Sequence, residues 1–355
     1  MKKLAEELKG KYSEKEIVEL VKYLKPSKLK TKKPTVKDTY KSDITNLFSV
    51  IKNNKIRPVV SKCMVKNGSI IGTNLECAVI IPDKWDIPEG IYTKQMMNLK
   101  TYPDTYKEDL DEFPVINTSK QGELTTYNKT DLESALSKTI FSAFKDSYNL
   151  SVNVVRFTKD SIVASDTYRL VINNIKGNSD FSLPLKTSIL LQKLLKNSDV
   201  ETVEIYLSEN EVEIYIGDII VKSMVVDLAF PNVKYIIENC QFSSEITINH
   251  SSKELAEIMK KLYTISKDNS DGKNSFIFDF IKKELRAVGI DNKINIPIEF
   301  DGEIDIKAIS LNAKFIEEYL KTVELDCVKM SFQDHKSAVK IEDNYYIMPL
   351  AMEED

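Results

Sequence analysis

Residues 160–172 read DSIVASDTYRLVI, and this stretch decides how the rest of the chain is interpreted. Both ends are apolar and alternate as a half-buried strand does. The centre, residues 165–169, is instead polar and places a tyrosine beside an arginine. The pattern predicts two strands joined by a short break with unusual hydrogen-bonding capacity.

The same strand, break and strand occur again at 68–81 (GSIIGTNLECAVII) and 283–296 (KELRAVGIDNKINI). A short strand, a polar cap and an amphipathic helix precede each copy, at 38–51, 125–140 and 246–262. The expected helix caps are Ser42 or Asp43, Thr130 or Asp131, and Ser251 or Ser252. A second helix follows each copy, at 92–99, 185–197 and 311–323, and the units close with 111–116, 228–237 and 344–352. The chain therefore reads as a repeat of one α+β design.

The repeat predicts three domains, each with helices on one face of antiparallel sheets. Their expected bounds are 36–118, 119–240 and 241–355, after an N-terminal helical extension and basic linker at 1–35. The first domain is truncated, because the residues after Leu99 hold no strand pair where 200–227 reads as three strands.

Composition narrows the function classes. The hydrophobic fraction is 42%, and no apolar run has the length of a membrane span. The N-terminus is too charged for a signal peptide, and the four cysteines are scattered, which favours a reduced, cytoplasmic protein. Only two histidines are present, and no glycine-rich phosphate loop or nucleophile–base pair is visible. We therefore expect a non-catalytic protein without a metal or other cofactor.

The order of these motifs resembles the bacterial sliding clamp family, the β subunit of DNA polymerase III. The similar stretches are 164–170 (ASDTYRL), 230–233 (FPNV) and 348–350 (MPL), and the resemblance covers about residues 36–355. It implies three tandem clamp-type domains, and no chemistry. It also implies a homodimeric ring on duplex DNA that tethers the replicative polymerase and clamp-loader subunits.

The resemblance further implies a peptide-binding groove between domains two and three, which takes short hydrophobic motifs of partner proteins. Its expected residues are Leu150, Ser165, Thr167, Tyr168, Arg169, Leu170, Pro231, Ile236, Asn312, Phe315, Tyr346, Met348, Pro349 and Leu350. Thr167 and Tyr168 replace a usual glycine and histidine of the family, so peptide specificity is expected to differ. Two plainer readings stand beside this one. Asp166 and Arg169 form a structural ion pair within a turn, and 345–348 is an ordinary terminal strand.

Lysines on the repeat helices are expected to face the DNA backbone without reading bases. They are Lys138, Lys145, Lys193, Lys196, Lys253, Lys260, Lys261 and Lys314. The plainer reading is a solvated helix face. The six lysines of 25–37 are most simply a linker, with a DNA- or partner-binding arm as the alternative.

Whether the ring closes depends on the truncated first domain, because family dimers join an edge strand of domain one to an edge strand of domain three. A head-to-tail contact closes only if both complementary faces exist. The alternative function is a clamp-like monomeric adaptor or competitor, which binds clamp-binding peptides without closing a ring on DNA.

Overall fold

The computed structural model describes residues 36–103, 110–146, 148–267 and 274–352. The chain divides into two compact units, Met1–Ser42 and Asp43–Asp355. Of the first unit only 36–42 is described, so the expected N-terminal helix and almost all of the lysine run lie outside the described residues. Everything below concerns the second unit, except for the start of one helix. No described helix is long and apolar enough to cross a membrane.

The first part of the chain is one helix, four strands and a short second helix. The elements are α3 (Val36–Val50), the 3-10 helix η1 (Pro58–Ser61), β1 (Cys63–Lys66), β2 (Ser69–Thr73), β3 (Cys77–Pro82), β4 (Gly90–Tyr92) and α4 (Lys94–Leu99). The expected strand before residue 42 is wrong, because α3 already begins at Val36. No glycine or proline interrupts 36–50, so nothing in this stretch stops a helix from starting early.

The middle part has two longer helices and eight strands. The elements are β5 (Glu123–Asn128), α5 (Lys129–Thr139), η3 (Ile140–Ser142), β6 (Val154–Phe157), β7 (Ser161–Ser165), β8 (Arg169–Asn174), β9 (Phe181–Pro184), α6 (Leu185–Lys196), β10 (Thr202–Leu207), β11 (Glu211–Ile216), β12 (Ile219–Met224) and α7 (Val233–Glu238). The cap of α5 is Asn128 rather than Thr130 or Asp131, because its side chain accepts from the amides of both.

The last part repeats the same plan. The elements are β13 (Ser244–Ile248), α8 (Ser252–Ser266), β14 (Ser275–Asp279), β15 (Glu284–Val288), β16 (Lys293–Pro297), β17 (Phe300–Glu303), β18 (Ala308–Asn312), α9 (Ala313–Leu320), β19 (Val328–Phe332), β20 (Val339–Ile341) and β21 (Tyr345–Ile347). Ser251, one of the two expected caps, caps α8, and the structure adds a reciprocal capping box with Glu254. Leu255, Met259 and Leu262 of α8 are buried against the sheets.

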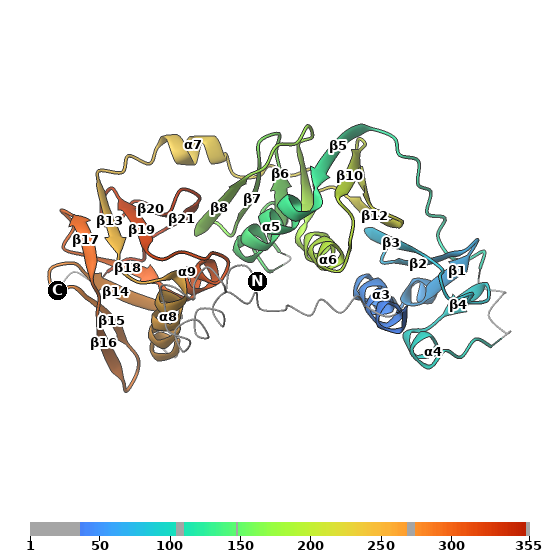
Figure 1. Cartoon of the computed structure of the whole chain (residues 1–355), viewed down its shortest axis with the longest axis horizontal. Coiled ribbons are helices and arrows are strands. Elements are labelled where there is room, and N and C mark those ends of the chain that lie inside the picture. The colour runs from blue at the N-terminus through green and yellow to red at the C-terminus, as the bar shows by residue number, and fades with distance from the viewer. Residues whose placement is uncertain (1–35, 104–109, 147, 268–273, 353–355) are drawn as a thin grey trace, which may run out of the picture. The chain divides into compact units, whose positions relative to one another are not determined.

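All strand pairs are antiparallel, and they form three sheets (Figure 1). The eight-stranded sheet has the order β4-β1-β2-β3-β12-β11-β10-β5, the nine-stranded sheet β17-β13-β19-β20-β21-β8-β7-β6-β9, and the four-stranded sheet β16-β15-β14-β18. Helices and antiparallel sheets therefore make an α+β fold, as predicted.

Two strand pairs join consecutive parts of the chain. We call the pairing of β3 with β12 the first junction and the pairing of β8 with β21 the second junction. The strands β2–β3, β7–β8 and β15–β16 are the three predicted strand–break–strand copies. β16 is the equivalent of β3 and β8, but it is an edge strand that pairs only with β15 among the described strands.

Candidate functional site

The polar break at 165–169 is a loop tied by its own side chains. The Ser165 hydroxyl donates to the Arg169 carbonyl (2.8 Å) and accepts from the Thr167 amide (3.1 Å). Asp166 Oδ1 accepts from the amides of Tyr168 (3.1 Å) and Arg169 (3.0 Å). Thr167 has a φ of 76°, which a β-branched residue rarely adopts. The polar residues therefore hold a strained turn between β7 and β8.

The Arg169 side chain is buried and engaged within the chain. Nε lies 2.8 Å from Asp166 Oδ2 and Nη1 lies 2.6 Å from Glu318 Oε2. Nη2 donates to the Phe141 carbonyl (2.9 Å), and the guanidinium lies 4.1 Å from the Phe315 ring centroid. Burial alone would lower the pKa of Arg169, but Tyr345 and the two carboxylates leave it raised. The ion pair of Arg169 with Asp166 within the turn is therefore present, and a second pair with Glu318 joins β8 to α9.

Strand alternation divides the expected groove residues between two faces of the nine-stranded sheet. Leu170 and Tyr346 are cross-strand partners, and both pack against Val163. Arg169 directly precedes Leu170 in β8, so its side chain leaves the opposite face, toward α9. Asn312 caps α9 by accepting from the Phe315 amide (3.2 Å). Leu170 and Tyr346 thus come together on one face, and Arg169 and Phe315 on the other.

The connecting segment 227–238 covers the face that carries Leu170 and Tyr346. Phe230, Val233, Ile236, Cys240 and Phe242 pack, half-buried, against the Val163–Leu170–Tyr346 cluster. Between this segment and strands β6–β8 lies an open cavity of about 1040 Å³. Pro231 lines it together with Val163 and Ile172. We call this cluster with its cavity the second-junction groove.

Exposed side chains form the rim at the ends of β8 and β21. Tyr168 is 58% exposed and Met348 is 42% exposed, and the Met348 amide donates to the Tyr168 carbonyl (2.8 Å). Pro349 and Leu350 are half-buried, and the Leu350 amide donates to the Ser310 carbonyl (2.8 Å). The terminal strand is therefore an ordinary core strand up to Ile347, and only the residues beyond it are accessible.

Leu150 lies in a different place from the other expected groove residues. It lines a separate pocket of about 530 Å³ together with Leu190 of α6 and Val50 of α3. It therefore provides no wall of the second-junction groove.

The expected DNA-facing lysines lie on or next to the repeat helices. Six are exposed and two, Lys138 and Lys314, are half-buried. Lys145 follows η3 and lies 3.4 Å from Glu318, which is also the partner of Arg169. Sequence reasoning found no partner for Glu318 because Arg169 is 149 residues away.

No group of three histidine, cysteine, aspartate or glutamate side chains in the described ranges is placed to hold a metal ion. The site thus comprises an apolar cluster with an open cavity, exposed Tyr168 and Met348 beside it, and exposed lysines on the helices. The class that the fold defines is a repeated α+β protein.

Comparison with known proteins gives the family. The sequence model of the DNA polymerase III beta subunit, central domain, matches residues 126–232. A beta sliding clamp from Mycoplasma capricolum is 21% identical over 253 residues, which cover 66% of this chain and 65% of that relative. This match therefore spans less than two thirds of the relative's length.

Solved structures agree. The DNA polymerase III beta subunit of Thermotoga maritima superposes with a TM-score of 0.73 at 25% identity, over 88% of this chain and 97% of that chain. A sliding clamp from Bartonella birtlesii, solved bound to griselimycin, has a TM-score of 0.75 at 17% identity, over 89% and 98%. Residues 126–232 thus match the central-domain family of the DNA polymerase III beta subunit, and the chain is similar in fold to bacterial sliding clamps.

Proposed function

We propose that this protein is a DNA sliding clamp that tracks duplex DNA and tethers a replicative polymerase through the second-junction groove. The observation that carries the proposal is the buried Val163–Leu170–Tyr346 cluster under segment 227–238, with an open cavity beside it and exposed Tyr168 and Met348 at the ends of the adjoining strands. Peptide grooves of this kind need apolar walls for anchor side chains and a few polar groups to orient the backbone. A protein with this role is expected in the cytoplasm.

Rim residues give the cleanest test of peptide binding, because their substitution leaves the core intact. A labelled, neutral pentapeptide with leucine and phenylalanine side chains is titrated against the protein by fluorescence anisotropy. We expect Tyr168→Ala to weaken binding about tenfold, as loss of an aromatic anchor does. Tyr148→Ala is the matched control, because Tyr148 is 81% exposed and lies outside the groove. Equal affinity of the two variants would place the peptide elsewhere.

Contact with DNA is proposed to run through the lysines on the repeat helices. Contacts that neutralise phosphates without reading bases give salt-dependent, sequence-independent binding. A matched pair of charge changes tests this: Lys193→Gln with Lys196→Gln, against Lys336→Gln with Lys340→Gln away from the repeat helices. We expect only the first pair to lower affinity for a duplex and flatten its salt dependence.

A monomeric adaptor or competitor is the second candidate function, and one observation favours it. β4, the outermost strand of the first part, has three residues, and no strand occurs between β4 and β5 in the described residues. The part of domain one that would meet domain three of a second protomer is thus missing from the described chain. Light scattering across a dilution series tests the ring.

Retention on DNA separates the two functions. A closed ring loaded on a nicked circle stays bound in high salt and leaves when the circle is linearised. A dimer with this behaviour supports the clamp. A monomer that binds the pentapeptide, but leaves circles and linear DNA equally fast, supports the adaptor.

A further inference from the structure

The loop at the first junction repeats the loop at the second junction bond for bond. The Thr73 hydroxyl donates to the Cys77 carbonyl (2.9 Å) and accepts from the Leu75 amide (2.9 Å). Asn74 Oδ1 accepts from the amides of Glu76 (3.0 Å) and Cys77 (2.8 Å). Leu75 has a φ of 78°, against 76° for Thr167. Residues 73–77 are therefore the structural equivalent of 165–169.

The strand that pairs with each loop is also equivalent. The Met224 amide donates to the Glu76 carbonyl (2.9 Å), as the Met348 amide does to the Tyr168 carbonyl (2.8 Å). A phenylalanine–proline pair begins the covering segment in both places, at 113–114 and 230–231. The first junction therefore has the backbone of a groove, with a methionine at the same point of its rim.

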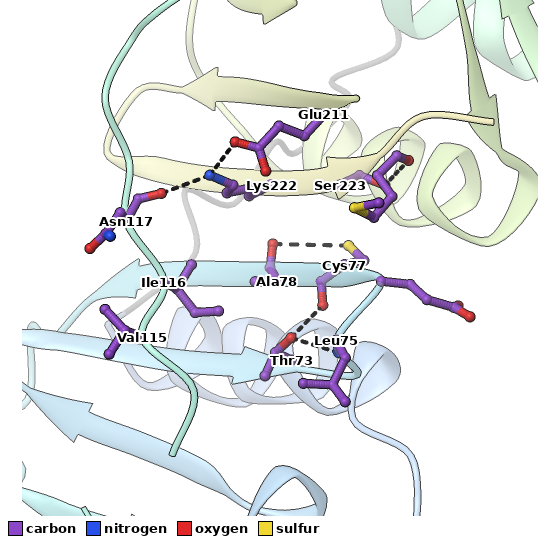
Figure 2. Close-up of a pocket in the computed structure, with 12 residues that line it drawn as sticks. Thr73, Leu75, Cys77, Ala78, Val115, Ile116, Asn117, Glu211, Lys222 and Ser223 are labelled. Carbon is purple, nitrogen blue, oxygen red and sulfur yellow. Dashed lines mark hydrogen bonds and ion pairs between the residues drawn. The ribbon is translucent and has the colours of Figure 1, made fainter. Parts of the chain in front are cut away.

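The side chains inside the two grooves differ. Ala78 pairs with Lys222 across the first junction, where Leu170 pairs with Tyr346 across the second. The small Ala78 leaves a pocket of about 270 Å³ under the segment that carries Val115 and Ile116, as Figure 2 shows. Leu75, Val115 and Met224 line it and are 46%, 82% and 49% exposed. This volume suits one or two side chains of a ligand.

The charged side chains around the pocket indicate which kind of ligand it favours. Lys222 Nζ is already engaged, 2.6 Å from Glu211 Oε1 and 2.9 Å from the Asn117 carbonyl oxygen (Figure 2). Glu213, buried behind it, lies 3.4 Å from the same Nζ. Glu76 adds an exposed carboxylate to the lining. Carboxylates therefore outnumber the one cation of the pocket, which favours a positively charged group on an incoming ligand.

We infer that the first junction is a second peptide groove, which takes an extended segment carrying an aliphatic side chain next to a lysine or arginine. The aliphatic group fills the space above Ala78, and the cation faces Glu76 and Glu211. The inference rests on the proposed peptide-binding role of the second-junction groove, whose architecture it shares. The two grooves thus accept different tails, one neutral and apolar, the other basic and aliphatic.

One methionine on each rim allows both grooves to be read in one experiment. The protein is labelled with ¹³C-methyl methionine, and the signals of Met224 and Met348 are assigned with Met224→Leu and Met348→Leu. Three hexapeptides are titrated: alternating leucine and lysine, alternating leucine and glutamate, and a neutral one of leucine, serine and phenylalanine. We expect the leucine–lysine peptide to move Met224, the neutral peptide to move Met348, and the leucine–glutamate peptide to leave Met224 unmoved.

Two variants locate the response. Ala78→Leu fills the pocket with the residue of the second junction and should remove the Met224 response while Met348 still responds. Glu76→Gln changes only an exposed charge, so it keeps the fold, and should weaken the leucine–lysine peptide about fivefold. Glu299→Gln is the control, since Glu299 is exposed and lies outside the pocket.

The outcomes separate the two proposals. A silent Met224 with a responsive Met348 overturns the second groove and leaves the proposed function standing. If the Met348 signal does not move but the Met224 signal does, the proposed tethering of a polymerase at the second junction is wrong, and peptide binding at the first junction stands. A Met224 response that survives both Ala78→Leu and Glu76→Gln means that the basic peptide binds elsewhere, and also overturns the inference.

Discussion

The two junctions have the same backbone conformation but differ in the side chains that line them. Both have a five-residue loop tied by a hydroxyl and an Asx side chain, and both have a positive φ at the third residue. At the second junction the pair Leu170 and Tyr346 makes an apolar floor, and Arg169 locks the other face to α9. At the first junction Ala78 and Lys222 make a small polar pocket, and Cys77 stands where Arg169 does. Local hydrogen bonds therefore set the loop, while the side chains on each sheet face set what the junction does.

The largest expected effect concerns the buried ion pairs of Arg169, one of which joins β8 to α9. Arg169→Ala should lower the free energy of unfolding by about 3–5 kcal/mol, because it leaves the carboxylates of Asp166 and Glu318 without their buried partner. Urea denaturation measures it. Cys77→Ala is the matched change at the first junction, where we expect about 1 kcal/mol. Equal losses would mean that the two junctions are held in the same way.

The next-largest expected effect concerns Glu213, a buried carboxylate at the first junction. Glu213 accepts from the amides of Ser119 and Lys120 and from Tyr215, and it pairs with Lys222. Burial opposes its ionisation, yet these hydrogen bonds hold the pKa of Glu213 below its usual 4.5. Glu213→Gln should therefore lower the free energy of unfolding by about 2 kcal/mol at pH 7.

The sign of the pH dependence follows from the lowered pKa of Glu213. Its contribution is fully present above pH 4.5 and is lost as pH falls through the lower folded-state pKa. The gap between parent and Glu213→Gln should thus stay constant down to about pH 4.5 and close below it. Glu211→Gln, a more exposed partner of Lys222, is the control and should cost under about 1 kcal/mol. A gap that widens in acid would contradict the assignment.

A smaller effect tests whether both loops store the same strain. Thr167→Gly and Leu75→Gly should each raise the free energy of unfolding by about 0.5 kcal/mol, because relief of the positive φ exceeds the added entropy of the unfolded chain. Thermal unfolding of both variants measures it. Thr126→Gly in β5 is the control and should destabilise. Opposite signs at the two loops would break their equivalence.

The smallest expected effect concerns the second partner of Glu318. Lys145→Ala removes an ion pair whose lysine side chain is 64% exposed, so the change in unfolding free energy should be about 0.3 kcal/mol or less. The same denaturation series as for Arg169→Ala measures it. A loss near that of Arg169→Ala would show that Glu318 depends on both cations equally.

Much of the fold could be predicted from the sequence, because it depends on local patterns. Apolar spacing placed α8, the repeat placed α9, and Ser251 was one of the two residues expected at the start of α8. Contacts between distant residues could not be read in this way. The Arg169–Glu318 pair and the separation of Leu150 from the groove depend on how the strands and helices meet, and no local pattern encodes that.

The groove prediction shows the same limit on a finer scale. A contiguous motif names its residues as a group, yet alternation along β8 sends Leu170 to one face and Arg169 to the other. The five groove residues expected between Ser165 and Leu170 therefore do not all line one surface. Of these five, only Thr167 and Tyr168 are exposed.

The outer edge of β16 has no partner among the described strands. The Asn292 carbonyl and the Ile298 amide bond toward β15, so alternation turns the backbone of Lys293, Asn295 and Pro297 outward. Proline has no N–H, so these three residues offer three carbonyl acceptors but only two amide donors, those of Lys293 and Asn295. A strand docked on this edge would lose one ladder hydrogen bond at Pro297. The edge is therefore less suited to open-ended sheet growth than a plain edge strand.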